Sequence, residues 1–391
     1  MTGRPERLEQ IRATVVRALR PVESEPVGLE EAAGRWLAEP VAAAAPAPPV
    51  DCSAMDGYAV RSGDVPGPAS LPVTRTVFAG DPPGPPLAAG EAARIFTGAP
   101  LPPGADAVVR EEAVRAEGDR AVFSTPARPG ENVRRAGEDV AAGGLALAAG
   151  VRLGGRQRAL LRAVGVERVR VYRPARVRVI STGDELVSGR TPDSNGLAIA
   201  ALCRAAGAEV CAVRAPDRLA EVGEAISSAA AAADLVITIG GVSVGARDLV
   251  PRALAALAAE VRLHGVPMKP GKPFLFGLLA GTPVLGLPGS PSACLAAFEV
   301  FGRPALLAVC GAARLTRPEV AVRLAEPVAG RPGRARLLWA ALSADGRVRP
   351  LGRDAAQVRG PALAQALILV PADAGDLAEG TEVRAWVLDG D

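Results

Sequence analysis

The chain has 391 residues, more than one ordinary hydrophobic core accommodates, so we expect about two to four domains. Its 45 basic and 42 acidic residues almost cancel, which leaves no overall field to recruit nucleic acid. The five cysteines are scattered, with no Cys-x-x-Cys pair, which argues against a zinc knuckle or a disulfide framework and fits reduced thiols in the cytoplasm.

The N-terminal segment predicts neither export nor membrane insertion. Pro5 to Leu19 has the pattern of an amphipathic helix with Arg and Glu, and it lacks the apolar core of a secretory signal. One uncharged stretch, Pro273 to Phe298, is long enough to cross a bilayer, but prolines and glycines interrupt it. We therefore expect a cytoplasmic protein in which this stretch forms a buried strand, loop and helix.

Two β-rich regions flank the middle of the chain. Pro40 to Val133 is rich in Pro and Gly, which predicts a β-rich lobe with strands at Val73–Phe78, Ala107–Arg110 and Ala121–Ser124. We expect a first domain at 1–140, made of the N-terminal helix and this lobe, and a helical linker segment at 141–175. Residues 316–391 predict a small β-barrel with strands at Val320–Leu324, Arg336–Ala340, Ala366–Val370 and Glu382–Val387.

Between these regions, short β-branched runs alternate with Ala- and Leu-rich helical runs. This pattern predicts an α/β doubly wound parallel sheet in a domain at 176–315. The expected strands are Val177–Ile180, Glu209–Arg214, Leu235–Ile239, Val261–Val266 and Pro283–Leu287. The expected helices are Leu197–Ala206, Ala220–Ala233, Leu249–Ala259 and Ser292–Ala308.

Ligands of such sheets bind beyond the carboxyl ends of the strands, so the loops expected there carry the functional prediction. The first loop holds Ser181, Thr182, Gly183, Asp184 and Glu185. The others are Gly240 to Asp248, Lys269 to Pro273, and the proline-flanked run Pro288, Gly289, Ser290, Pro291 and Ser292.

The loop from Gly240 to Asp248 has two interpretations. A Gly-rich loop between a strand and a helix presents unpaired N–H groups, here at Gly240, Gly241, Ser243 and Gly245, that bind phosphate. The same letters spell Gly-x-Ser-x-Gly, the nucleophile elbow of hydrolases. Ser243 would then need the single histidine, His264, which follows by only 21 residues. We favour Ser243 as a hydrogen-bond donor to phosphate.

Charged side chains in these loops suit an anion and a hard metal ion. Lys269 and Lys272 are the only two lysines, and they flank Gly271 in a proline-bounded turn, which favours phosphate binding over ordinary solvated lysines. Glu185 and Asp248 are candidate ligands of Mg²⁺ bridging ligand oxygens. Asp184 fits a helix cap as well as a functional role.

Several stretches together resemble the molybdopterin molybdenumtransferase family. In the N-terminal region these are Ser53 to Ala59, Thr97-Gly98, Pro103 to Asp106 and Gly137-Glu138-Asp139. They continue through Ser181 to Leu186, Asp193-Ser194-Asn195, Gly240 to Gly245 with Asp248, Lys269 to Pro273, and Gly286 to Gly289. Judged singly, Asp56, Thr97 and Asp139 read as turn residues. In this order and number, the motifs are far more specific than any one of them.

The resemblance implies an Mg²⁺-dependent transferase that inserts molybdate into adenylylated molybdopterin and releases AMP. Its catalytic residues are expected at Asp56, Thr97, Asp139, Glu185, Asp248, Lys269 and Lys272, with Glu185 and Asp248 holding the metal. Pterin-binding positions are expected at Ser181, Thr182, Gly183, Asp184, Asp217, Gly240, Gly241, Ser243, Gly245, Pro288, Gly289, Ser290 and Pro291.

The resemblance also implies a homodimer whose cleft joins the central domain of one subunit to the N-terminal lobe of the other. Expected protein partners are the molybdopterin adenylyltransferase and downstream cofactor-handling proteins. Two alternatives remain at this point: a molybdopterin adenylyltransferase, and a noncatalytic molybdopterin-binding or scaffold protein.

This sequence departs from the family pattern at a few positions. Ser290 and Ser292 stand where the family more often has Asn and Val, and Ala246-Arg247 stand where Glu-Ala is common. In the C-terminal domain, Trp339 and Ala356 are the nearest matches to an Arg and a Ser of the family.

Overall fold

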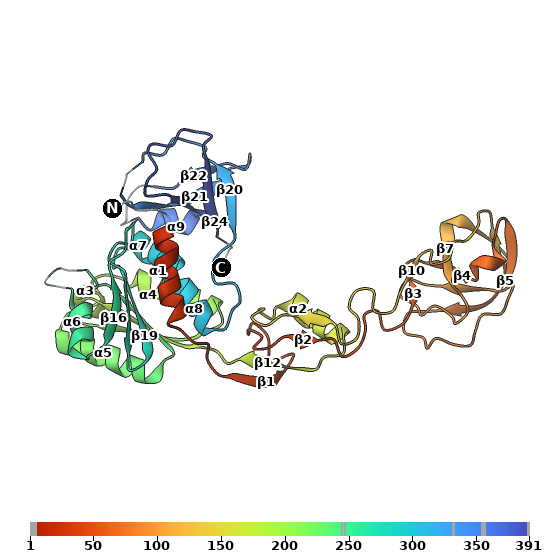
Figure 1. The fold of residues 1–391 in the computed structure, drawn as a ribbon, viewed down its shortest axis with the longest axis horizontal. Coiled ribbons are helices and arrows are strands. Elements are labelled where there is room, and N and C mark those ends of the chain that lie inside the picture. The colour runs from red at the N-terminus through yellow and green to blue at the C-terminus, as the bar shows by residue number, and fades with distance from the viewer. Residues whose placement is uncertain (1–5, 244, 246–247, 331–332, 353–356, 389–391) are drawn as a thin grey trace.

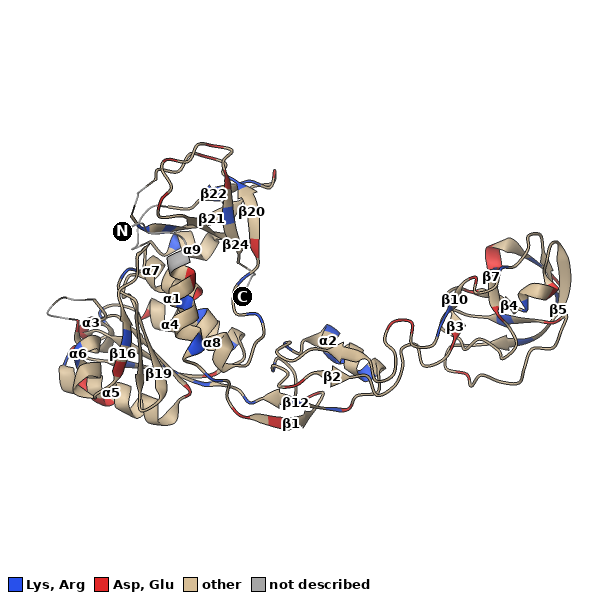
Figure 2. Ribbon diagram, in the orientation of Figure 1, with Lys and Arg blue, Asp and Glu red and all other residues tan. Residues whose placement is uncertain are grey.

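The computed structural model describes residues 6–243, 245, 248–330, 333–352 and 357–388. The molecule is elongated, with a β-rich lobe at one end and an α/β domain beside a C-terminal β-sheet at the other (Figure 1). A linker module separates the two ends. Ala246, Arg247 and Ala356 lie outside the described residues. Acidic and basic side chains are spread over every module, as the balanced composition predicts (Figure 2).

The central domain is built on one six-stranded sheet in the order β14-β13-β15-β19-β18-β16. The five predicted strands all form, and four of them lie side by side in parallel. Their bounds are β13 (Arg176–Thr182), β14 (Glu209–Ala215), β15 (Leu235–Ile239), β16 (Glu260–His264) and β19 (Thr282–Leu287).

The prediction of a wholly parallel sheet is wrong, because a further strand, β18 (Leu275–Leu279), runs antiparallel between β16 and β19. Ala280 and Gly281 both have positive φ and join β18 to β19 in a two-residue turn. Both strands are almost entirely apolar, so no polar alternation marks β18 as a separate strand.

Helices cover both faces of this sheet. On one face, α4 (Ser194–Ala205) and the run α7 (Pro291–Ala297), η3 (Phe298–Gly302, a π-helical turn) and α8 (Arg303–Val309) pack on Val177 and Ile237. On the other face, α5 (Leu219–Ala232) and α6 (Leu249–Ala256) pack on Ile180 and Val236. The two faces use alternate residues of the same strands, which confirms the doubly wound arrangement.

The helical run Pro291–Val309 is, among the described residues, long and apolar enough to cross a membrane. It is mostly buried inside the protein, with Phe298, Phe301 and Leu306 fully enclosed. These burial values are those of a core helix. The N-terminal helix α1 (Glu6–Arg17) lies beside α8, and its Leu8 and Val15 join the same buried cluster.

The N-terminal lobe is an insertion into the linker module. In the module, β1 (Ser24–Gly28) pairs with β12 (Arg168–Tyr172), and β2 (Val41–Ala42) pairs with β11 (Leu145–Leu147), beside α2 (Gly155–Ala163).

The lobe has a sheet in the order β7-β4-β6-β5-β9-β8, and β3 pairs with β10 beside it. Its elements are β3 (Cys52–Ser53), β4 (Gly57–Val60), η1 (Ser62–Asp64), β5 (Ala69–Val77), β6 (Ala92–Ile95), β7 (Ala107–Arg110), η2 (Glu111–Ala113), β8 (Val114–Glu117), β9 (Arg120–Phe123) and β10 (Val133–Arg134).

The C-terminal region forms a curled sheet in the order β17-β21-β23-β24-β20, with β22 also on β21. All four predicted strands form there. Its elements are β20 (Glu319–Arg323), β21 (Ala335–Leu342), β22 (Val348–Pro350), α9 (Arg359–Leu363), β23 (Ala366–Val370) and β24 (Glu382–Val387). An isolated β-bridge joins Leu324 to Val348. A bridge of this kind does not close the sheet into a barrel, so the predicted β-barrel stays a prediction. The strand β17 (Met268–Lys269) comes from the central domain, so the two sheets are joined at the lysine loop.

Candidate functional site

Three of the predicted loops, those after β13, β15 and β19, meet at the carboxyl edge of the central sheet, where short contacts link each loop to the next. Thr182 Oγ1 donates to the carbonyl of Ile239 at 3.3 Å, and the N–H of Gly240 donates to the carbonyl of Leu287 at 3.0 Å. Asn195 Nδ2 donates to the carbonyl of Gly289 at 2.7 Å. Asn195, at the start of α4, was part of a recognised motif but not among the predicted site residues.

The hydroxyl oxygen of Ser181 has no hydrogen-bond partner among the described residues at this edge. Its side chain is fully buried, and its Oγ makes no hydrogen bond within the described part of the chain. A Cβ built on Gly196 would lie 2.7 Å from that oxygen and 2.3 Å from Asp193 Oδ2, so only glycine fits there. An unsatisfied buried hydroxyl is costly, which makes Ser181 a natural donor or acceptor for a bound group.

The acidic residues after β13 form a pair with the segment after β14. The N–H of Asp217 donates to Asp184 Oδ1 at 3.1 Å, and the N–H of Asp184 donates to Asp217 Oδ2 at 3.4 Å. Both side chains, and that of Glu185 at the start of α3 (Asp184–Val187), are exposed. Gly183 has φ of 156°, and a Cβ there would lie 2.6 Å from Glu185 Oε1, so this turn requires glycine.

Asp248 organises the Gly-rich loop from within. Its Oδ1 accepts the N–H of Ser243 at 2.9 Å, and its Oδ2 accepts the N–H of Gly245 at 2.8 Å. These two amides therefore serve the loop itself, and that of Gly240 is bound to Leu287, contrary to the expectation that all three are unpaired. Gly240 and Gly241 both have positive φ, and they lie against Thr182.

The two lysines lie on the turn after β16, and both are exposed. Gly271 between them has φ of 106° and packs against α7, where a Cβ would lie 3.6 Å from Ala297 Cβ. Lys269 also lines a cavity of about 410 Å³ between this turn and the C-terminal sheet, together with Ser292, Arg336 and Trp339.

The cavity wall contains a contact that the sequence did not suggest. Trp339 Nε1 donates to Ser292 Oγ at 2.9 Å, and both side chains are buried. Ser292 lies in the first turn of α7, directly after the exposed Ser290 and the half-buried Pro291. Two departures from the family pattern are thus partners, which only the meeting of the two domains reveals.

In the lobe, the structure brings together two residues 41 positions apart. The N–H and the Oγ1 of Thr97 both donate to Asp56 Oδ1 at 2.7 Å. These bonds, first that of the backbone N–H, hold the pKa of the Asp56 carboxyl below its ordinary value. Asp139 lies apart from this pair, where its N–H donates to the carbonyl of Ala47 in the linker module.

One chain does not gather all the predicted site residues. Asp56 directly precedes β4, at one end of the molecule, whereas Glu185 lies in α3 at the other end (Figure 1). The hydrolase interpretation also lacks its contact. His264 Nε2 lies 2.9 Å from the carbonyl of Val242, and no hydrogen bond joins it to Ser243 in the described residues.

The donor set fits a metal ion that is completed by its substrate. No group of three or more His, Cys, Asp or Glu among the described residues could hold a metal by itself. Mg²⁺ usually binds through one or two carboxylates, with phosphates and water filling the other positions. Glu185 offers an exposed carboxylate, whereas both oxygens of Asp248 already accept amides of its own loop, so an ion held there would take most of its ligands from the substrate and water.

Comparisons with known proteins cover nearly the whole length of the chain. Residues 6–165 match the model "MoeA N-terminal region (domain I and II)", 178–308 match "Probable molybdopterin binding domain", and 321–388 match "MoeA C-terminal region (domain IV)". Molybdopterin molybdenumtransferase 2 of Mycobacterium tuberculosis (strain H37Rv) is 38% identical over 400 residues, covering 97% of this chain and 98% of that protein. The chain belongs to the molybdopterin molybdenumtransferase family.

Other members agree in sequence and in fold. The molybdopterin molybdenumtransferase of Nostoc sp. (strain PCC 7120) is 42% identical over 312 residues, 76% of this chain and 72% of that protein. The crystal structure of a molybdopterin biosynthesis moeA protein from Pyrococcus horikoshii OT3 superposes with a TM-score of 0.83 at 26% identity, covering 97% of this chain and 99% of that chain. The family resemblance inferred from the motifs is confirmed.

Proposed function

We propose that this protein inserts molybdate into adenylylated molybdopterin, with release of AMP, to give molybdenum cofactor. The observation that carries the proposal is the joining of three loops of the carboxyl edge, beside which Ser181 Oγ has no hydrogen-bond partner among the described residues. The membership of the chain in the molybdopterin molybdenumtransferase family supports the same reaction.

In this proposal the residues of the edge have separate tasks. Lys269 and Lys272 stabilise the negative charge of the phosphates and of molybdate as AMP leaves. Glu185 and Asp248 would hold Mg²⁺, which, when bound, neutralises phosphate charge and polarises the bond to be broken. Ser181, the amide of Gly241 and the Pro288–Pro291 loop would orient the pterin phosphate.

We further propose that the working unit is a homodimer. Asp56 and Thr97 belong to the same site as Glu185 only if a second copy brings its lobe to the carboxyl edge, because within one chain they lie at opposite ends (Figure 1). The lowered pKa of Asp56 keeps it ionised, so it would present a negative charge to that edge.

The deciding experiment measures AMP release from adenylylated molybdopterin, with and without molybdate, before and after removal of Mg²⁺ by EDTA. Glu185→Ala is the sharper variant, because Glu185 holds no other loop in place. Asp248→Ala also removes the partner of the Ser243 and Gly245 amides. We expect Lys272→Met to lower the rate of AMP release by about a hundredfold or more. Tight substrate binding without any AMP release would instead indicate a noncatalytic pterin-binding protein.

The dimer is tested by mixing two inactive variants. Asp56→Ala and Glu185→Ala subunits, exchanged in equal amounts, should regain about a quarter of wild-type activity, because half the dimers then contain one intact site of two. No recovery, despite subunit exchange, would place both residues in a site within one chain.

A further inference from the structure

Two phenylalanines stack on the surface of the lobe beside Asp56 and Thr97. The strands β5 and β6 are parallel, and Val77 pairs with Ile95 at their ends. Phe78 and Phe96 follow these paired positions, and their rings lie 5.0 Å apart and 8° from parallel. Val77 and Ile95 are buried beneath the sheet, so the next residue of each strand faces outward.

Phe78 of this pair is exposed, Phe96 is half-buried, and the pair has polar neighbours on one side. Phe78 is 54% exposed, although most large apolar side chains of the protein are buried. The carboxylate of Asp56 uses only Oδ1 to accept the two bonds from Thr97, and no hydrogen bond to its Oδ2 occurs in the described chain. The guanidinium of Arg94 lies 5.3 Å from the centroid of the Phe96 ring and 2.8 Å from Glu111.

An aromatic face beside a free carboxylate oxygen suits one class of flat heterocycle. A pterin presents an amino group and a ring N–H on the same edge, and both donate hydrogen bonds to a carboxylate, while its faces stack on aromatic rings. Adenine presents an acceptor nitrogen beside its amino group, so it pairs better with an amide than with a carboxylate.

We propose that Phe78 and Phe96 stack against the pterin ring of the substrate while the free oxygen of Asp56 accepts hydrogen bonds from its edge. This inference rests on the proposed function and deepens it. It assigns the pterin end of the substrate to the lobe of one subunit and the phosphate end to the carboxyl edge of the other. Phe78 and Phe96 then determine specificity for a pterin.

The test measures binding of 6-carboxypterin and, separately, of AMP to the full-length protein by calorimetry. Phe78→Ala should weaken 6-carboxypterin binding by about tenfold to a hundredfold, the usual loss when a stacking ring is removed, and leave AMP binding unchanged. Phe78→Tyr should retain binding, whereas Phe78→Leu, which keeps apolar bulk without an aromatic face, should not. Leu145→Ala, an exposed apolar residue of the linker module, is the matched control.

Three results would overturn the inference. The first is wild-type affinity for 6-carboxypterin in Phe78→Leu. The second is dissociation of Phe78→Ala and Phe78→Leu to monomers in light scattering, which would make the pair a contact between subunits. The third is AMP release by Phe78→Leu with an unchanged KM. AMP release by the wild-type protein is measured in parallel. Pterin binding that depends on Phe78, in a protein that does not release AMP, supports the pterin site and contradicts the proposed function. AMP release with an unchanged KM in Phe78→Leu supports the proposed function and contradicts the pterin site.

Discussion

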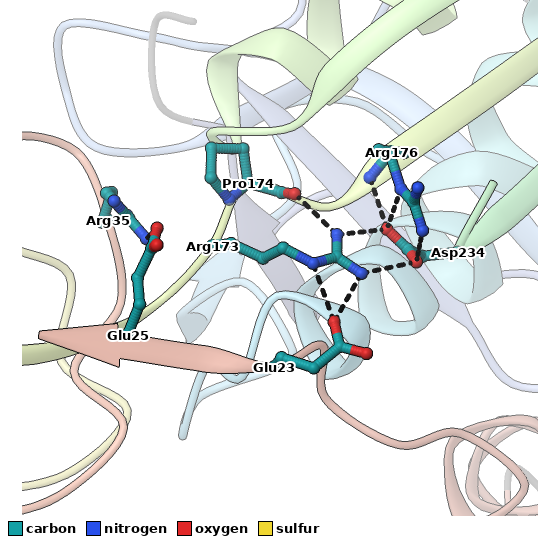
Figure 3. A network of polar contacts seen from close by, with 7 residues as sticks. All are labelled: Glu23, Glu25, Arg35, Arg173, Pro174, Arg176 and Asp234. Atoms are coloured by element: carbon teal, nitrogen blue, oxygen red, sulfur yellow. Dashed lines mark hydrogen bonds and ion pairs between the residues drawn. The ribbon is translucent and has the colours of Figure 1, made fainter. Parts of the chain in front are cut away.

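The central domain is joined to its two neighbours by contacts of opposite character. Its junction with the linker module lies at the amino ends of β13 and β15, where Arg173 contacts Glu23 and Asp234, and Arg176 also binds Asp234 (Figure 3). Glu23 is 80% exposed. Its junction with the C-terminal sheet lies at the carboxyl edge and contains an ion pair between Arg317 and Glu299 that is 2% and 4% exposed.

The difference shows that the free-energy cost of losing an Arg–carboxylate contact depends on how deeply the pair is buried. Solvent screens the contact with Glu23, so its loss should cost little and depend on salt, whereas Arg173 and Asp234 are only 25% and 14% exposed and their contact should contribute more. The Arg317–Glu299 pair lies in the apolar core, where removing the carboxylate should cost far more than at the surface. We therefore expect salt to weaken the linker junction more than the C-terminal junction.

The largest effect is expected at the buried pair. Glu299→Gln leaves the guanidinium of Arg317 buried without its carboxylate, whose two oxygens it now contacts at 2.9 and 3.0 Å. We expect the free energy of unfolding to fall by about 3–5 kcal/mol, measured by urea denaturation. Glu117→Gln, which breaks the exposed pair with Arg115, should cost less than about 1 kcal/mol. Equal losses in the two variants would contradict the comparison.

An intermediate effect is expected at the linker junction. Partial burial works to raise the pKa of Asp234, but hydrogen bonds from Arg173 and Arg176 outweigh it and hold that pKa well below its ordinary value. Asp234→Asn should cost about 1–3 kcal/mol at neutral pH. Because the folded pKa is depressed, this stabilisation is complete above the unfolded pKa of about 3.9 and is lost as pH falls below it. Urea denaturation at pH 7 and pH 3 should therefore show wild type and variant converging in acid, and a constant gap would refute the assignment.

A smaller effect is expected at the Trp339–Ser292 contact. Trp339→Phe and Ser292→Ala should each lower stability by about 1 kcal/mol through loss of the hydrogen bond, since Phe keeps most of the apolar contact. The double variant should lose less than the sum of the two single losses, because both remove the same bond. Strict additivity in this cycle would mean that the bond contributes nothing at the junction.

The smallest effect concerns chemistry rather than stability. Burial raises the pKa of the Cys203 and Cys310 thiols to about 12, whereas Cys211 is exposed. Iodoacetamide at pH 8 should therefore modify Cys211 and spare Cys203 and Cys310. Cys310 follows α8 beside the linker junction, close to Ala175 and Asp234, so its labelling should become faster in Asp234→Asn. Unchanged labelling there would show that the linker junction stays closed without the Asp234 carboxylate.

Much of the central domain could be predicted, because its strands and helices carry the strong periodic signals of a sheet covered on both faces. Leu235–Ile239 was placed without error, since a wholly buried strand bounded by Asp234 and Gly240 has few alternatives. The strand Leu275–Leu279 was missed, because its turn uses Ala280, a residue that rarely adopts positive φ. The pairing of Asp248 with the amides of its own loop was missed because N–H groups and carboxylates look equally available in a sequence.

The sequence by itself determined the family and predicted the loops of the candidate site, because glycines, prolines and charges at fixed spacing limit which local backbone conformations and chemistry are possible. Only the tertiary structure decided that Asp56 binds Thr97, that Trp339 binds Ser292, and that Phe78 stacks on Phe96. These contacts join residues 18 to 47 positions apart through strand register or domain packing. The register of paired strands depends on how much apolar surface the whole sheet buries, and a short stretch of sequence does not show this.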